Sequence, residues 1–133
     1  MIVEADRMRI YEVILNLLSN AIKFTKKAVQ SMLISMAKVA IIVFTTMKSN
    51  QDNINEKSVD EIVISIRDRG IGIDPKIQEE LFSIFVTKYE TGSGLGLFIS
   101  KGIVEAHGGK VWAENNAEGK GATFSFTLPI SQD

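Results

Sequence analysis

The residues best suited to bind an anion form a glycine-rich segment, TGSGLGL, in which Gly92, Gly94 and Gly96 stand at every second position. An apolar stripe with helical spacing follows at once, so the last glycine stands where a helix begins. Backbone N–H groups at a helix N-terminus favour phosphate. The segment is not a P-loop, because Leu97 and Phe98 occupy the places of the required Lys and Ser or Thr. Taken alone, it predicts either a phosphate-binding loop or a flexible hinge.

Two asparagines one helical turn apart, Asn16 and Asn20, form a second group that could bind a ligand. They lie at the edge of the apolar face of a predicted helix, although asparagine is a mediocre helix former. Their neutral amide oxygens suit Mg²⁺, which prefers hard oxygen donors and completes its shell with water and substrate phosphates. The alternative is that both amides make ordinary hydrogen bonds to a neighbouring loop.

Asp68 closes a predicted strand and is followed by Gly70 and Gly72 in the segment RDRGIGI. A carboxylate at a strand end can accept a hydrogen bond from an exocyclic amine, and neighbouring glycines let a flat ring approach the backbone. The alternative is an ordinary turn residue that ends the strand. Taken together, an amine acceptor, neutral oxygen ligands for a cation and a phosphate-binding loop describe a nucleotide.

Two amphipathic helices and several strands are the elements that would position these groups. The first helix begins after Asp6, a good N-cap, and apolar residues recur with helical spacing over 10–22. The second helix follows Gly96 and ends at Gly108 and Gly109. The further expectations are a strand over 2–5, a buried strand within the apolar window 31–47, a loop over 48–60, a half-buried strand over 61–68, a helix over 76–85, and a terminal hairpin from 109–116 and 121–130.

These elements sum to an α/β fold. It is a two-layer sandwich in which a mixed, mostly antiparallel sheet carries about three helices on one face and meets solvent on the other. The chain of 133 residues suits a single domain, 1–133. The apolar window 31–47 is shorter than a bilayer span and is interrupted by Lys38, so a buried strand is favoured over a membrane segment.

Composition narrows the partners and the compartment. Lys and Arg number 15 against 16 Asp and Glu, a formal net charge of −1, so we expect no nucleic-acid or anionic-membrane partner. The chain has no cysteine, which excludes disulfides, zinc held by thiolates and a thiol nucleophile. The first residues lack a signal-peptide pattern, so a cytoplasmic location is expected, whether or not the parent protein is anchored in a membrane.

Four segments match, in order, the motifs of a known family: RIYEVILNLLSNAIKFT, DRGIGI, LFSIFVTK and TGSGLGLFISKGIVEAHGGKVWAEN. With the terminal GKGATFSFTLP they cover most of the chain. The sequence resembles the catalytic and ATP-binding domain of sensor histidine kinases, within the superfamily that includes DNA gyrase B subunits, MutL-type repair proteins and a heat-shock chaperone. The resemblance implies a Bergerat-type ATP-binding fold, here lacking its first strand, with ATP and Mg²⁺ as cofactors.

The same resemblance assigns roles to individual residues. It implies that Asn20 coordinates Mg²⁺ with Asn16 near the phosphates, and that Asp68 accepts a hydrogen bond from the adenine amino group. Lys23 and Lys88 would lie near the phosphates. No catalytic residue is implied within this chain. The complete implied nucleotide-binding set is Asn16, Asn20, Lys23, Asp68, Gly70, Gly72, Ile73, Lys88, Gly92, Gly94, Leu95 and Gly96.

The resemblance also implies the function. The chain would be the ATP-binding domain of a two-component sensor histidine kinase, presenting the γ-phosphate to a histidine on a separate dimerisation and phosphoacceptor domain, with a response regulator downstream. His107, the only histidine of the chain, is a structural residue at a helix end in this family. Related ATP hydrolases carry a water-activating glutamate in the place of Asn16, which favours a kinase over a hydrolase. The alternative is a non-catalytic ATP-sensing or protein-interaction module.

The interval between Thr25 and Glu61 departs from the family, which has a short turn and one strand there. Residues 26–61 therefore form an atypical, partly apolar segment that adds a strand or promotes self-association. A missing first strand would also leave a sheet edge exposed. A homodimer through that edge or through 26–61 is a further expectation.

Overall fold

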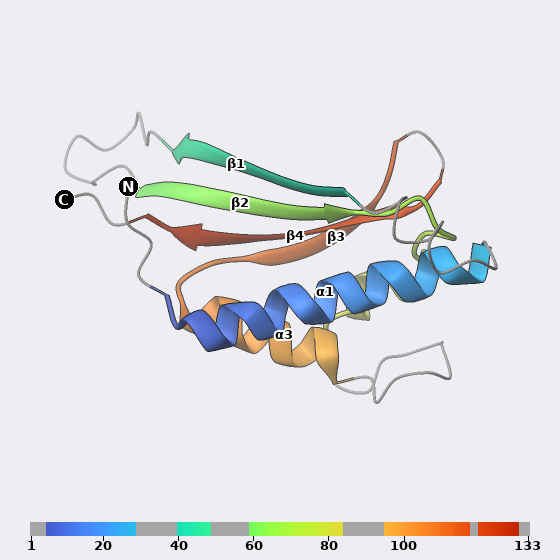
Figure 1. Cartoon of the computed structure of the whole chain (residues 1–133), viewed down its shortest axis with the longest axis horizontal. Helices are drawn as coiled ribbons and strands as arrows, with labels where there is room; N and C mark the ends of the chain where they lie inside the picture. The colour runs from blue at the N-terminus through green and yellow to red at the C-terminus, as the bar shows by residue number, and fades with distance from the viewer. Residues whose placement is uncertain (1–4, 29–39, 49–58, 84–94, 118–119, 131–133) are drawn as a thin grey trace.

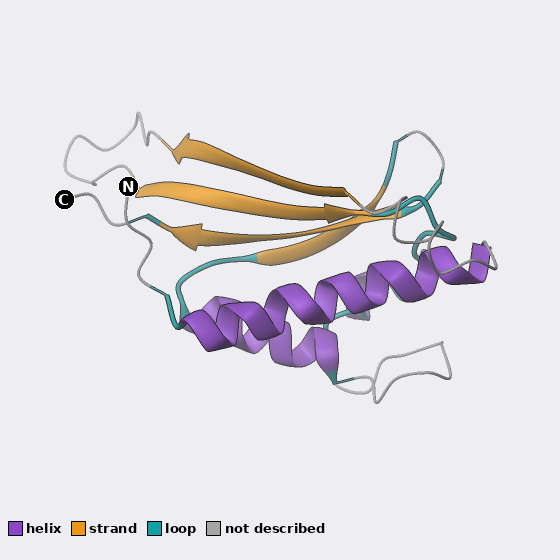
Figure 2. Ribbon diagram, viewed as in Figure 1, coloured by secondary structure: helices purple, strands orange, loops and turns teal. Residues whose placement is uncertain are grey.

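A four-stranded antiparallel sheet and two helices packed on one of its faces form the two layers of the protein, as Figures 1 and 2 show. The computed structural model describes residues 5–28, 40–48, 59–83, 95–117 and 120–130. The predicted α/β sandwich is confirmed. The described elements are α1 (Arg7–Ala28), β1 (Ala40–Lys48), β2 (Val59–Arg67), the 3₁₀ turn η1 (Gln78–Glu80), α3 (Gly96–Ala106), β3 (Val111–Asn115) and β4 (Ala122–Pro129).

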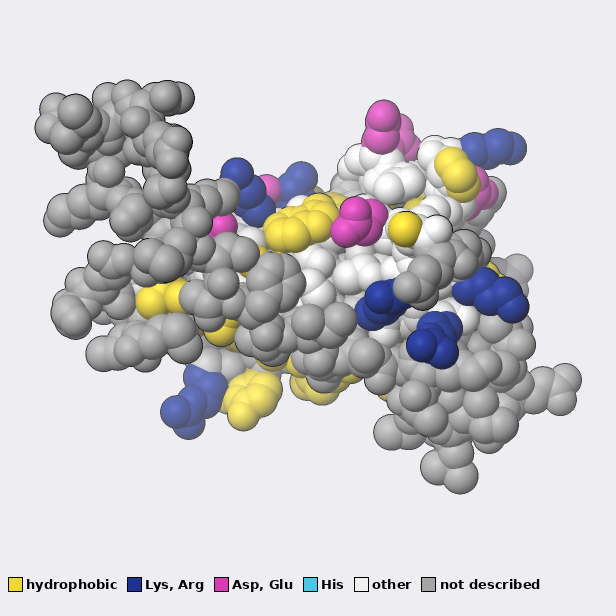
Figure 3. Space-filling model, turned by 90° about the horizontal axis from the view of Figure 1, so that it is seen from above, with side chains coloured by type: hydrophobic (Ala, Val, Ile, Leu, Met, Phe, Trp, Pro, Cys, Tyr) yellow, Lys and Arg dark blue, Asp and Glu magenta, His cyan; other side chains and the backbone are white. Residues whose placement is uncertain are grey.

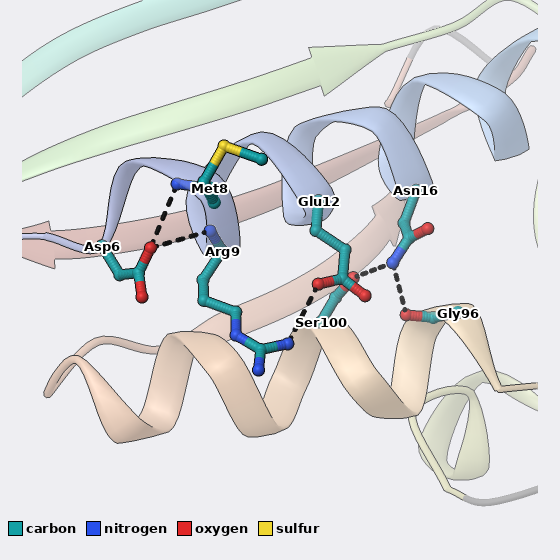
Figure 4. A network of polar contacts seen from close by, with 7 residues as sticks. All are labelled: Asp6, Met8, Arg9, Glu12, Asn16, Gly96 and Ser100. Atoms are coloured by element: carbon teal, nitrogen blue, oxygen red, sulfur yellow. Dashed lines mark hydrogen bonds and ion pairs between the residues drawn. The ribbon is translucent and has the colours of Figure 1, made fainter.

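Helix α1 begins at the predicted cap. The Asp6 carboxylate accepts hydrogen bonds from the N–H groups of Met8 at 3.1 Å and Arg9 at 3.3 Å, two donors that have no partner within the helix (Figure 4). The apolar stripe turns toward the sheet, where Val13, Leu17 and Ala21 are completely buried. The same rotation leaves Glu12 and Asn16 on the side of the helix toward α3, which packs beside α1.

His107 joins the end of α3 to the beginning of α1. Its Nδ1 lies 2.7 Å from the Ile103 carbonyl oxygen, which can only accept, so Nδ1 carries the proton and donates. Its Nε2 then accepts the N–H of Asp6 at 3.0 Å. These two contacts occupy both ring nitrogens and agree with the structural role expected for this histidine.

The sheet has the strand order β1-β2-β4-β3, and every neighbouring pair is antiparallel. The register of β2 and β4 sets Ile66 opposite Phe124 and Ile64 opposite Phe126. Ile66, Phe124 and Phe126 belong to one core cluster with the buried face of α1 and with Val104 of α3. The alternation of apolar residues read from these two strands is therefore the pattern that seats both helices on the sheet.

The opposite face of the two central strands is less solvated than expected. Ser65, Ser125 and Thr127 are all buried there, because each is a small residue on a strand flanked by neighbours on both sides. Their hydroxyl groups have partners: Ser65 and Ser125 lie 2.7 Å apart, and Thr127 accepts the N–H of Lys110 at 2.9 Å. The second face of the sheet, predicted to meet solvent, is therefore buried at these three residues.

The predicted helix over 76–85 was also wrong in its described part. Asp74 caps a turn by accepting the N–H of Lys76 at 2.9 Å, but only the single 3₁₀ turn η1 follows. Ile77, Leu81 and Phe82 still pack against the core cluster, so the apolar residues anchor this segment although it does not continue as an α-helix. Residues 84 and 85 lie outside the described part.

The predicted loop over 48–60 is shorter than expected, since β1 extends to Lys48 and β2 begins at Val59. Residues 2–4 of the strand predicted over 2–5 lie outside the described residues, as do residues 29–39 and 49–58 of the segment 26–61. Within the described residues, neither helix combines the length and the apolarity needed for a membrane span. Figure 3 shows one face of the molecule, on which charged side chains of both signs lie among apolar ones.

Candidate nucleotide-binding site

Asp68 follows the last residue of β2 and is completely buried. Its Oδ1 accepts two backbone hydrogen bonds, from Gly70 N–H at 2.9 Å and from Ala122 N–H at 3.2 Å. Its Oδ2 is buried as well and has no hydrogen-bond partner, the only such side-chain atom among the described residues. An unpaired buried acceptor costs about 1–3 kcal/mol. Such a group therefore calls for an explanation, and a ligand that donates a hydrogen bond supplies one.

Burial raises the pKa of the Asp68 carboxyl group above 3.8, and the hydrogen bonds from the N–H groups of Gly70 and Ala122 lower it in part. Desolvation is the larger of these effects. The fold therefore maintains a polar group that would be more stable in water. Perturbed acids in such positions are typical of functional sites.

The two glycines after Asp68 differ in conformation and in contacts. Gly70 is buried and supplies one of the N–H donors to Asp68. Gly72 has φ of 78°, a left-handed conformation that side chains rarely adopt. Ile73, which ends this segment, is almost buried and belongs to the core cluster. Asp68, Gly70, Gly72 and Ile73, all members of the predicted nucleotide-binding set, lie in one short segment at the end of β2.

Gly121, in the turn between β3 and β4, presses against the same segment. A Cβ atom at this position would lie 2.1 Å from the Asp68 carbonyl oxygen, and the residue has φ of 82°. No sequence argument singled out Gly121, because the only local signal is a glycine before a strand. Its contact with Asp68 exists only through the pairing of β2 with β4.

Asn16 lies on the face of α1 that meets α3 (Figure 4). Its Nδ2 donates to the carbonyl oxygen of Gly96 at 3.3 Å and to Oγ of Ser100 at 3.2 Å. Because the carbonyl oxygen can only accept, the NH₂ group must point to α3, which leaves Oδ1 for another partner. Ser100 is completely buried and was not predicted from the sequence.

The remaining predicted residues are described to different extents. Asn20 is half-buried, and its side chain makes no hydrogen bond to the described part of the chain. Lys23 belongs to α1, but its side chain lies outside the described part. Leu95 is the N-cap residue of α3, and its carbonyl oxygen accepts the N–H of Ile99 at 2.8 Å. The predicted residues outside the described part are Lys88, Gly92 and Gly94.

Metal binding by a cluster of charged side chains is not indicated in the described ranges, where no group of three or more His, Cys, Asp or Glu residues is arranged to hold an ion. Glu12, one turn before Asn16, forms an exposed ion pair with Arg9 at 3.4 Å. The amide oxygens of Asn16 and Asn20 stay the cation ligands that the sequence predicts, and no contact in the described part of the chain tests that prediction. Such ligands fit an ion that also binds to phosphate oxygens.

The chain matches the family model described as "Histidine kinase-, DNA gyrase B-, and HSP90-like ATPase" over residues 5–132. The chain therefore belongs to this family of ATPases. The sensor protein FixL of Bradyrhizobium diazoefficiens is 37% identical over 132 residues, which are 99% of this chain and 23% of FixL. The sensor histidine kinase WalK of Bacillus subtilis is 36% identical over 137 residues, with 98% of this chain and 19% of WalK covered.

Solved structures agree with these relatives. The nucleotide-free catalytic domain of the histidine kinase ThkA has a TM-score of 0.64 and 32% identity, with 96% of this chain and 70% of that catalytic-domain chain covered. Full-length ShkA in complex with AMPPNP has a TM-score of 0.64 and 28% identity, covering 98% of this chain and 23% of ShkA. The sequence and fold are those of the ATP-binding catalytic domain of a two-component histidine kinase. The chain spans about a fifth of the length of FixL and WalK.

Ser100→Ala is expected to weaken nucleotide binding about 3- to 10-fold, because the Asn16 amide loses one of the two acceptors that orient it, a change of about 1 kcal/mol. Calorimetric titration with ADP measures the effect. Ser19→Ala is the matched control, since Ser19 is exposed on α1. Equal affinities for the two variants would mean that Ser100 does not orient Asn16 toward the ligand.

Proposed function

We propose that this chain is the ATP-binding half of a protein-histidine kinase, which presents the γ-phosphate of ATP to a histidine on a separate dimerisation and phosphoacceptor domain. The observation that carries the proposal is the unpaired, buried Oδ2 of Asp68 at the end of β2. It is the acceptor that a base with an exocyclic amine requires. The glycine-containing segment beside it leaves backbone rather than side chains next to such a base.

The phosphates lie, in this proposal, toward the beginning of α3. Gly96 opens that helix, where unpaired N–H groups and the helix dipole favour negative charge. Asn16 offers its Oδ1 there because its NH₂ group is already engaged. Asn20 is the proposed Mg²⁺ ligand, with Lys23, Lys88, Gly92 and Gly94 as further phosphate-side residues. Mg²⁺, when bound, supplies charge neutralisation on the phosphate oxygens.

The site favours phosphoryl transfer to an external acceptor over hydrolysis. The amide of Asn16 cannot take a proton from water, so the residue provides no general base. His107 does not serve as the acceptor, because its two ring nitrogens already contact Ile103 and Asp6. The acceptor histidine must then come from another domain, and a response regulator would follow it. We also propose a cytoplasmic location, where ATP is available.

Calorimetric titration of the wild-type chain with AMPPNP, with and without Mg²⁺, tests this function. We expect binding that Mg²⁺ strengthens, and at least a 10-fold loss of the Mg²⁺-dependent part in Asn20→Ala. Ser19→Ala, on the same helix but exposed, should bind as the wild type does. The absence of binding by folded wild-type chain would refute the proposal.

Transfer of the γ-phosphate separates the kinase from the second function class. Incubation with ATP and the phosphoacceptor domains of related kinases should yield acid-labile phosphohistidine on the acceptor. Binding of ATP without transfer to any of these domains would favour a non-catalytic ATP-sensing or interaction module.

A further inference from the structure

We propose that Asn115, the last residue of β3, is a positioning residue of the base pocket. It would hold the segment 68–73 in the shape that brings Oδ2 of Asp68 to the base. The inference rests on the proposed nucleotide function. It concerns a residue on a different strand, 42 positions beyond the backbone group that it binds.

Asn115 pairs with the backbone of one residue through both ends of its amide. Its Oδ1 accepts the N–H of Ile73 at 2.7 Å, and its Nδ2 donates to the carbonyl oxygen of Ile73 at 3.0 Å. This pair satisfies the N–H and the carbonyl group of Ile73, which lies outside the strands of the sheet. The amide thus replaces the strand partner that Ile73 lacks, and it fixes the position of the segment where it enters the core.

The other end of the segment is held by the next residue, Asn116. Its Nδ2 donates to the carbonyl oxygen of Asp68 at 2.8 Å and to that of Lys120 at 2.9 Å. Its Oδ1 accepts the hydroxyl of Thr123 at 2.6 Å. Two successive asparagines therefore bind the first and the last residue of the segment that contains Gly70 and Gly72.

Gly72 lies between the two ends of the segment that Asn115 and Asn116 bind. A Cβ atom at Gly72 would lie 2.8 Å from Oδ1 of Asn115, closer than such contacts allow. The glycine and the asparagine are therefore fitted to each other. With φ of 78° at Gly72, the segment has a conformation that its own backbone does not enforce. Without Asn115, the segment between the fixed Asp68 and the buried Ile73 side chain gains conformational freedom.

Asn115 is itself exposed, and it contributes no apolar surface to the core. If Asn115 has a purely structural role, its substitution should lower the free energy of unfolding modestly and leave base selectivity unchanged. A positioning role predicts a loss of discrimination between bases with and without an exocyclic amine. A site built to receive a hydrogen bond discriminates strongly only while its acceptor stays in place.

The experiment compares the wild type with Asn115→Ala, Asn115→Ser and Glu114→Ala. Glu114 is the neighbouring exposed residue of β3 and serves as the control. Affinities for ADP and for inosine diphosphate, whose base has a carbonyl in place of the amine, are measured by calorimetry. Amide hydrogen exchange of Ile73 is measured without nucleotide, and unfolding by denaturant reports stability.

For Asn115→Ala we expect roughly a 10-fold loss of ADP affinity, a smaller ratio of ADP to inosine diphosphate affinity, and about 10-fold faster exchange at Ile73, each following from the loss of the two hydrogen bonds to Ile73. Asn115→Ser, which keeps one short polar group, should lie between. Glu114→Ala should match the wild type. An unchanged affinity ratio in Asn115→Ala would overturn the proposal.

The exchange measurement separates this proposal from the nucleotide function itself. If the wild-type chain binds neither nucleotide, the proposed function fails. Faster exchange at Ile73 in Asn115→Ala would still support the hold on the segment, whereas unchanged exchange would overturn it.

Discussion

Asp68→Asn is expected to lower the affinity for ADP at least about 100-fold, which is about 2.7 kcal/mol, while the domain stays folded. The amide has the shape of the carboxylate, and its oxygen can still accept the N–H groups of Gly70 and Ala122. Its NH₂ group then replaces Oδ2 and presents a donor to the donating amine of adenine. Two opposed donors in a buried site cost more than a lost hydrogen bond.

Glu114→Gln is the control for this experiment, because it makes the same change from carboxylate to amide at an exposed position of β3. It should leave the ADP affinity at the wild-type value. Calorimetry measures both variants, and circular dichroism verifies that they are folded. An Asp68→Asn chain that binds ADP as tightly as the wild type would remove Asp68 from the site.

Asp68→Asn should also change how the stability of the nucleotide-free chain depends on pH. Burial raises the pKa of Asp68 in the folded chain above the ordinary aspartate value of 3.8, so the folded state binds this proton more tightly than an unfolded chain does. The contribution of Asp68 to stability therefore decreases as pH rises from 3.8 through the folded pKa, and it is restored as pH falls. The stability advantage of Asp68→Asn over the wild type should be largest at neutral pH and shrink on acidification. Denaturant unfolding at several pH values measures this difference.

Gly121→Ala is expected to destabilise the domain by about 3–5 kcal/mol, a large part of the stability of an ordinary domain. Alanine is strained at φ of 82°, and its Cβ atom would meet the backbone of Asp68 and Arg69 at 2.1–2.7 Å. Backbone atoms cannot move aside as the end of a long side chain can. The turn between β3 and β4 must therefore separate from the segment after β2.

Gly102→Ala is the matched control for Gly121→Ala. Gly102 lies within α3, is exposed, and has no atom within 4 Å of an added Cβ. The same chemical change should stabilise the chain there by about 0.5–1 kcal/mol, because alanine is the better helix former. Denaturant unfolding compares both variants with the wild type. A loss below about 1 kcal/mol in Gly121→Ala would contradict the close packing at Asp68.

The sequence predicted those features that repeat locally. The burial of Val13 and Leu17 followed from helical spacing, and the Asp6 cap from its position before that stripe. The apolar alternation in β2 and β4 was sufficient to predict the sheet face that carries the helices. Asp68 could be proposed as a site residue because one short segment combines a carboxylate at a strand end with two glycines after it.

The supports of the site could not be predicted in this way, since each depends on residues far apart in the chain. Asn115 reaches back 42 positions to Ile73, and Asn16 reaches forward 84 positions to Ser100. Serine and asparagine are common in turns, and neither Ser100 nor Asn115 differs from its neighbours in the sequence in a way that marks it. The prediction of a helix over 76–85 was wrong although Ile77, Leu81 and Phe82 pack against the core. Apolar spacing alone did not distinguish a single 3₁₀ turn from an α-helix.

The two hydrogen bonds to Oδ1 of Asp68 come from donors at very different distances along the chain, 2 and 54 positions away. During synthesis, a chain that has not yet extended to Ala122 has the carboxylate but not its second donor, and it also lacks the strand that buries it. Nucleotide is therefore expected to bind and stabilise only those molecules in which β4 has already paired with β2. Retention on immobilised nucleotide would then separate fully folded molecules from incompletely folded ones.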